Sequence, residues 1–126
     1  MDTKEVGTKL AELCREGKNL EAIETLYSET IVSVEAVGDE TMPAVMEGID
    51  AIRGKNQWWL DNHEVHEGDV RGPFPNENRF ALIFNFDVTA KAGPMAGQRM
   101  KIEEVALYTV EDGKITREEF YYDMGM

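Results

Sequence analysis

The sequence has 126 residues, 25 of them acidic and 13 basic, and its formal net charge at pH 7 is −12. A chain of this length is expected to form a single domain over residues 1–126 with one hydrophobic core. A negative field repels phosphate backbones and anionic lipid surfaces, so the composition argues against nucleic-acid and membrane partners.

The cysteine content and the N-terminal stretch indicate a compartment. The single cysteine, Cys14, cannot form an intramolecular disulfide, and its amphipathic helical surroundings favour a buried structural thiol. The stretch MDTKEVGTKL lacks the basic and apolar segments of a signal peptide. No apolar run approaches the roughly 20 residues that span a bilayer. We therefore expect a cytoplasmic protein.

Apolar periodicity predicts the first half of the chain. Three- and four-residue steps predict helices over 3–15 and 20–27, and the β-branched run IVSV then begins a strand. Residues 38–48 contain Gly, Asp and Pro without a clean period and predict a loop. Helical spacing returns over 49–63, where Gly54 is expected to make a short helix irregular.

The second half of the chain predicts four strands. They occupy 64–74, 79–91, 99–110 and 114–124, and turn signals such as EDGK separate them. Helices that precede and are segregated from a mostly antiparallel sheet predict the α+β class.

Alternation along the strands predicts which side chains face the core. In the strand at 79–89 the inward face is expected to be Phe80, Leu82, Phe84, Phe86 and Val88. Ala81 and Ile83, on the opposite face, would suit contact with another subunit. In the next strand either Glu104, beside Tyr108, or Glu103 is inward, because a register error of one residue exchanges them. In the last strand we favour Phe120 and Tyr122 as inward.

Two glutamates are the leading chemical candidates. Glu35 interrupts the otherwise apolar stretch IVSVEAV and is either a solvated outward residue or the acid/base group of a pocket. In an apolar pocket the pKa of its carboxyl would rise, which suits a proton shuttle. Glu104 is either a second inward carboxylate or the partner of an Arg or Lys across the sheet.

The HEVHEG stretch at 63–68 does not predict a metal site, because His63 and His66 are three residues apart in a strand and no further ligand completes a set. His66 could act alone as an inward acid/base or hydrogen-bonding group, whereas His63 is expected to cap the helix or lie exposed. We expect no metal and no cofactor.

Aromatic and thioether side chains are candidates for ligand contact. Trp58 and Trp59 point about 100° apart on a helix, so one is expected to pack on the sheet and the other to lie at a pocket mouth or subunit surface. Candidates for binding a ligand are Tyr108, Trp58, Trp59, Phe84 and Tyr122. Methionines 42, 46 and 95 suit either an adaptable pocket rim or ordinary packing.

Three motifs in order carry a resemblance to a known family: LEAIETLYSETIVSVEAV, GIDAIRG and VEDGKITREEFYYD. The sequence resembles the SnoaL-like branch of the nuclear-transport-factor-2-like superfamily, which includes ketosteroid isomerase, polyketide cyclases, limonene epoxide hydrolase and scytalone dehydratase. The resemblance implies a conical α+β barrel, a curved sheet enclosing a pocket, and a homodimer formed through the outer sheet face. Other members are binding or scaffolding domains, so the fold does not settle function.

The resemblance also implies roles for individual positions. The position eight residues after Tyr27, where ketosteroid isomerase keeps its general-base aspartate, is Glu35. The positions of that enzyme's oxyanion donors hold Ala11 and either Val105 or Ala106, which donate no side-chain hydrogen bond.

Two functions follow as hypotheses. The first is a cofactor-independent acid/base isomerase, cyclase or hydrolase of a small apolar molecule, with Glu35 as base and His66, Glu104 and Tyr108 as polar partners. The second is a non-catalytic domain that binds a small ligand or dimerises.

Overall fold

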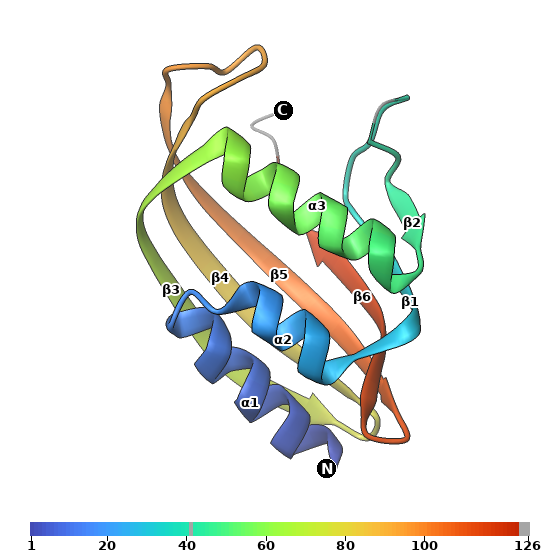
Figure 1. The fold of residues 1–126 in the computed structure, drawn as a ribbon. Coiled ribbons are helices and arrows are strands. Elements are labelled where there is room, and N and C mark those ends of the chain that lie inside the picture. The colour runs from blue at the N-terminus through green and yellow to red at the C-terminus, as the bar shows by residue number, and fades with distance from the viewer. Residues whose placement is uncertain (41, 124–126) are drawn as a thin grey trace.

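Three helices lie along one face of a six-stranded sheet (Figure 1). The structure is a computed structural model and describes residues 1–40 and 42–123. The elements are α1 (Thr3–Arg15), α2 (Asn19–Leu26), β1 (Tyr27–Val34), β2 (Val45–Glu47), α3 (Ile49–Asn62), β3 (His63–Asn76), β4 (Arg79–Ala90), β5 (Arg99–Glu111) and β6 (Lys114–Tyr121).

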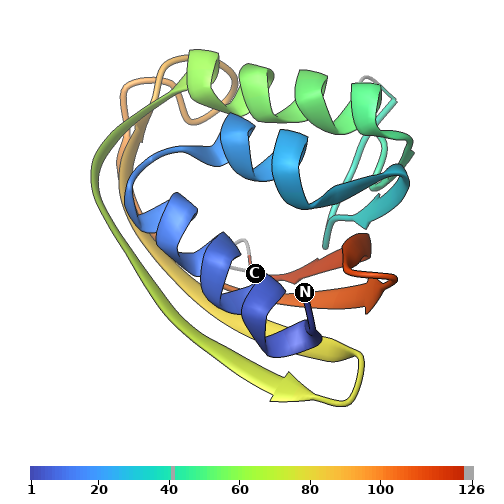
Figure 2. The same cartoon turned by 60° about the horizontal axis from the view of Figure 1, so that its bottom comes forward.

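The sheet has the strand order β2-β1-β6-β5-β4-β3. All of its neighbouring strands are antiparallel except β1 and β6, which run parallel. Figure 2 shows the sheet curving around the helices, so that it has a concave inner face and a convex outer face. The predicted α+β class, with helices on a curved and mostly antiparallel sheet, is confirmed.

Local signals in the sequence explain where α1 begins and ends. The Asp2 side chain accepts a hydrogen bond from the Glu5 amide at 2.8 Å, and the Glu5 side chain accepts one from the Asp2 amide, which forms a capping box. Gly17 follows the helix with a φ of 72°, a conformation that glycine adopts without steric cost. The chain can therefore turn directly into α2.

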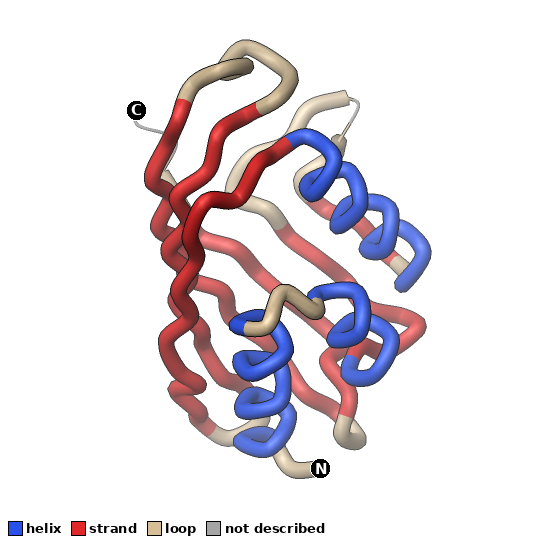
Figure 3. Tube along the Cα trace, turned by 60° about the vertical axis from the view of Figure 1, so that its left-hand side comes forward, coloured by secondary structure: helices blue, strands red, loops and turns tan. Residues whose placement is uncertain are grey.

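The core lies between the helices and the concave face. The inward face predicted for β4 is confirmed: Phe80, Leu82, Phe84 and Val88 are buried, and Phe86 packs against the core. In β5 the inward set includes Glu104, Ala106 and Tyr108, whereas Glu103 lies on the exposed outer face. The long edge strand β3 runs beside α1 (Figure 3), and the Arg15 guanidinium donates to the Val70 carbonyl at 3.0 Å.

The middle of the chain departs from the prediction in two ways. α3 continues without interruption through Gly54, an exposed position where an added Cβ would meet nothing within 4 Å. Part of the predicted loop at 38–48 forms the short strand β2, which pairs with β1. Met124, the last residue of the predicted final strand, lies outside the described residues.

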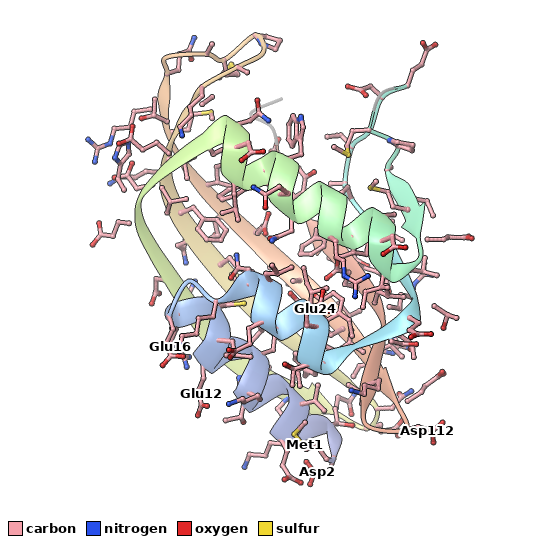
Figure 4. All side chains as sticks on the ribbon, viewed as in Figure 1. Met1, Asp2, Glu12, Glu16, Glu24 and Asp112 are labelled. Carbon is pink, nitrogen blue, oxygen red and sulfur yellow. The ribbon has the colours of Figure 1, made fainter. Side chains whose placement is uncertain are left out.

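Most carboxylates lie on the surface. Figure 4 shows Glu12 and Glu16 pointing outward from α1 and Glu24 lying on α2. Glu24 pairs with Arg53 of α3, whose guanidinium donates to it at 2.8 Å. Among the described residues, no helix is both long and apolar enough to cross a membrane. A smaller set of carboxylates, which includes Glu104 and Glu118, is turned inward by the fold.

Candidate functional site

Glu35 lies just beyond β1 on the side of the strand that faces the helices. Ile31 and Ser33, four and two residues earlier, are fully buried, and the alternation of the strand turns Glu35 toward the same face. Its backbone amide donates to the Ala44 carbonyl at 2.8 Å, which continues the β1–β2 pairing past the strand end. The Glu35 side chain is 19% exposed, so it is neither solvated nor sealed in the core.

Lys55 of α3 reaches across to this carboxylate. Its Nζ contacts Glu35 Oε1 and donates to Ser33 Oγ at 2.7 Å. The ammonium also lies 4.7 Å from the centroid of the Phe120 ring, a cation–π contact. The Lys55 side chain is 16% exposed, so the charge pair is shielded from most of the solvent that would screen it.

Glu118 of β6 is the buried end of the same network. Its Oε1 accepts from Ser33 Oγ at 2.8 Å, its Oε2 accepts from the Tyr27 hydroxyl at 2.5 Å, and Lys55 Nζ lies 3.8 Å away. Burial raises the pKa of Glu118, while Lys55 and the two hydroxyl donors oppose that rise. The same burial, together with the Glu118 charge, raises the pKa of Tyr27 well above its usual value.

Tyr122 and Glu104 complete the inner face at this end of the sheet. The Tyr122 hydroxyl donates to Glu35 Oε2 at 2.9 Å, so both oxygens of Glu35 have partners. Burial is the main cause that raises the pKa of Glu104 to about 7, and the negative charge of Glu35 is the second. Burial and the charges of Glu35 and Glu104 also raise the pKa of Tyr122. Glu104 is therefore a carboxyl group whose protonation changes near neutral pH.

The aromatic candidates divide between this face and its surroundings. Phe84 is the cross-strand neighbour of Glu104 and stacks on Phe86, and Trp59 packs on Phe86 with ring centroids 5.5 Å apart. Trp58 is 47% exposed. Tyr108 is buried, stacks on Phe80 and has a pKa raised by burial, so it belongs to the core behind the ionisable groups.

The two histidines lie away from the carboxylates. His66 is exposed at the bulge of β3 between Val65 and Glu67, and its Nε2 lies 2.6 Å from Thr89 Oγ1. The bulge interrupts the alternation that would have turned His66 inward. His63 is the C-cap residue of α3, as predicted: its Nδ1 donates to the Trp59 carbonyl, and its ring stacks on that of Trp59 with centroids 4.6 Å apart. Among the described residues, no group of three or more His, Cys, Asp or Glu side chains could hold a metal ion.

Four members of the network were not singled out from the sequence: Tyr27, Ser33, Lys55 and Glu118. Signals for three of them exist. Ser33 shares a face with Glu35, Glu118 shares one with Phe120 and Tyr122, and Lys55 follows the buried Ile52 by one helical turn. The sequence does not show that these three faces meet.

A cavity of about 240 Å³ lies elsewhere, at the turn between β3 and β4. Phe74, Asn78 and Phe80 are among its lining residues, and none of the inward carboxylates contributes to it. Its lining holds none of the candidate acid or base residues, so the candidate site remains the half-buried inner face around Glu35.

Comparison with known proteins adds three similar solved structures. One from Mesorhizobium loti, described as a candidate SnoaL-like polyketide cyclase with carbohydrate phosphatase as a second description, is 47% identical over 97% of this chain and 100% of its own, with a TM-score of 0.89. A candidate isomerase from Bacillus subtilis is 18% identical over 98% of this chain and 90% of its own, with a TM-score of 0.73.

The third structure is a Catenulispora acidiphila protein with a ketosteroid isomerase-like fold, crystallised with trimethylamine. It is 20% identical over 97% of this chain and 88% of its own, with a TM-score of 0.71. At this identity, and at that of the Bacillus protein, the likeness shows a shared fold alone. A search of curated proteins gave no match.

The family model described as a SnoaL-like domain matches residues 1–122. This match covers nearly all of the chain and agrees with the resemblance drawn from the three motifs. The chain therefore belongs to the SnoaL-like domain family.

Proposed function

We propose that this protein is a cofactor-independent enzyme that isomerises, cyclises or hydrolyses a small, largely apolar molecule by acid/base chemistry. One observation carries the proposal: Glu35 and Glu104 share a half-buried inner face but have different surroundings. Glu35 is held by an ammonium and a phenol, whereas burial and neighbouring negative charges raise the pKa of Glu104 to about 7. Glu35 is the proposed base and Glu104 the proposed acid, because such separated pairs divide these roles.

The surrounding side chains support an apolar substrate. Trp59, Phe84, Phe86 and Phe120 offer aromatic surface beside the carboxylates. Candidate cyclase and isomerase descriptions of similar structures agree with this chemistry. Phosphatase activity fits less well, because three inward glutamates against Lys55 repel a phosphate group.

Glu35→Gln should retain ligand binding and lose turnover. Thermal shift and native mass spectrometry against a library of small apolar carbonyl and epoxide compounds would first find a ligand that the wild type converts. The variant should convert it at least about 100-fold more slowly, the usual scale of a lost general base. Glu103→Gln, on the outer face, is the matched control and should convert it normally. Equal turnover by Glu35→Gln would remove Glu35 as the base.

A second candidate function is a non-catalytic domain that binds a small ligand. The direct contact of Lys55 with Glu35 favours it, because a structural ion pair would occupy the carboxylate in the same way. Under this alternative, the wild type would bind compounds from the library and release all of them unchanged.

We also propose a homodimer of this single domain through the outer sheet face, in the cytoplasm. Cross-strand neighbours form an apolar patch on that face: Ile83, Val105 and Tyr121 in one row, and Phe74, Ala81 and Leu107 in the next. Val105 is 39% exposed and Tyr121 52%, an arrangement that a second copy would cover. Sedimentation velocity should give a dimer for the wild type and a monomer for Val105→Arg. A wild-type monomer at high concentration would contradict the proposal.

A further inference from the structure

The ammonium of Lys55 has polar partners on two separate sides. On one side is Glu35, the proposed base, and on the other are Ser33 Oγ at 2.7 Å and Glu118 Oε1 at 3.8 Å. The two sides come from different places in the sheet, since Ser33 and Glu118 are buried in the paired strands β1 and β6, whereas Glu35 lies past the end of β1.

The direction of each hydrogen bond in this network is fixed. A lysine ammonium only donates, so Ser33 Oγ accepts from Lys55 and uses its own proton to donate to Glu118. Tyr27 donates to the other oxygen of Glu118. The buried carboxylate is thus the final acceptor, and the chain of donors that begins at Lys55 does not depend on Glu35.

Protonation of Glu35 would therefore release Lys55 on one side only. A neutral carboxylic acid no longer attracts the ammonium, while Ser33 and Glu118 still hold it in place. One N–H of Lys55 would then have no charged acceptor and would point toward the place where Glu35 had carried its charge. A cation fixed in advance where negative charge develops needs no reorganisation during the reaction.

We propose that Lys55 is a further catalytic residue of this site, and that Ser33 and Glu118 are its positioning residues. The inference rests on the proposed function of Glu35 as a base. In the step, Glu35 takes a proton from a carbon next to a carbonyl group of a neutral ligand. The electron pair of the broken C–H bond forms a C=C bond, and the carbonyl π pair moves to oxygen. That oxygen accepts a hydrogen bond from Lys55, so the negative charge leaves Glu35 for the ligand and the total charge is unchanged.

This proposal assigns a donor that the resemblance left unfilled. Ala11 and Ala106, two of the positions that the resemblance matches to the oxyanion donors of ketosteroid isomerase, are fully buried and carry no side-chain donor; Val105, the alternative to Ala106, is 39% exposed on the outer face. Lys55 supplies the missing hydrogen-bond donor from α3, a different element. The site as a whole favours a neutral ligand, because Glu35, Glu104 and Glu118 would repel an anion before proton transfer.

The test uses 4-nitrophenol, whose anion absorbs visible light and serves as an analogue of the charged ligand oxygen. Glu35→Gln is a neutral, isosteric analogue of the protonated base, so it should bind the phenolate about tenfold or more tightly than the wild type does. Glu35→Gln/Lys55→Met should lose this gain. Glu35→Gln/Lys101→Met, which changes an exposed lysine on the outer face, is the matched control and should keep it. Absorbance titration gives each affinity.

A second measurement does not need the double variant to fold. In the complex with Glu35→Gln, the absorbance of the bound phenol should show its ionisation at a lower pH than in free solution, because a fixed cation stabilises the anion. An unchanged or raised ionisation pH would overturn the proposal, as would absent binding or equal affinity in Glu35→Gln/Lys55→Met. Neither assay depends on turnover. If Glu35→Gln abolishes turnover but does not bind the phenolate more tightly, the proposal that Glu35 is the base stands and the proposed role of Lys55 is wrong.

Discussion

Replacing Glu104 by glutamine is expected to stabilise the protein by up to about 3 kcal/mol at about pH 8.5, and by almost nothing near pH 4.5. Burial and the charge of Glu35 raise the pKa of Glu104 in the folded chain from 4.5 to about 7. Between these values the folded state holds a proton that the unfolded state has released. The stability of the wild type therefore falls as the pH rises through this window, and above it the full cost of the buried charge remains.

Glutamine keeps the shape of Glu104 without its charge, so the gain should grow from about pH 4.5 to about pH 7 and then level off. Urea unfolding of both proteins across this range measures it. Glu103→Gln, one residue away on the outer face, is the matched control and should show no comparable gain. A variant that is less stable than the wild type at high pH would mean that the Glu104 carboxylate makes stabilising contacts. In that case its burial would not be the dominant effect.

Replacing Lys55 by methionine is expected to destabilise the protein by about 3–5 kcal/mol at neutral pH. The change leaves Glu118, whose side chain is 3% exposed, without its nearest cation. It also leaves Glu35 facing Glu104 and Glu118 with no compensating charge. Methionine fills a similar volume and retains contact with the Phe120 ring, so the loss reports charge rather than packing.

The loss should shrink at acid pH, because protonation of Glu118, whose pKa burial already raises, removes the uncompensated charge. Adding Glu118→Gln to Lys55→Met should recover part of the stability, since the two residues interact directly. Lys9→Met, on the exposed face of α1, is the matched control and should change stability by less than about 0.5 kcal/mol. Denaturant unfolding of the wild type, Lys55→Met, Glu118→Gln and the double variant completes the cycle. Strictly additive effects would show that Lys55 and Glu118 are not coupled.

Much of the fold could be predicted because hydrophobic alternation is a local signal. The face of β4 follows from its phenylalanines, and the choice between Glu103 and Glu104 is decided by which one shares a face with Ala106 and Tyr108. The short strand β2 has only three residues with exposed ends, so its apolar pattern could not distinguish it from a loop.

The candidate site was harder to predict from the sequence because its groups come from four distant segments: the end of β1, α3, β5 and the end of β6. Spacing after Tyr27 indicated Glu35, and alternation placed Glu104 on the inner face. The contact of Lys55 with Glu35 depends on how α3 crosses the sheet, which no local pattern records. The inward position considered for His66 is wrong for a similar reason, because a single bulged residue in β3 leaves His66 on the outside. The cap predicted for His63 is confirmed, since it depends only on the nearby helix end.

The parallel pairing of β1 with β6 has a consequence for how this network is assembled. Ser33 and Glu118 are separated by 85 residues, and Tyr27 and Glu118 by 91, yet both pairs are joined by hydrogen bonds. Such contacts of high sequence separation require a large loop to close first, which slows folding. During synthesis, β1 and α3 emerge long before β6. Until residue 118 leaves the ribosome, Lys55 lacks its buried counterion. The strand β6 is therefore needed both to pair with β1 and to supply the buried negative charge of the site.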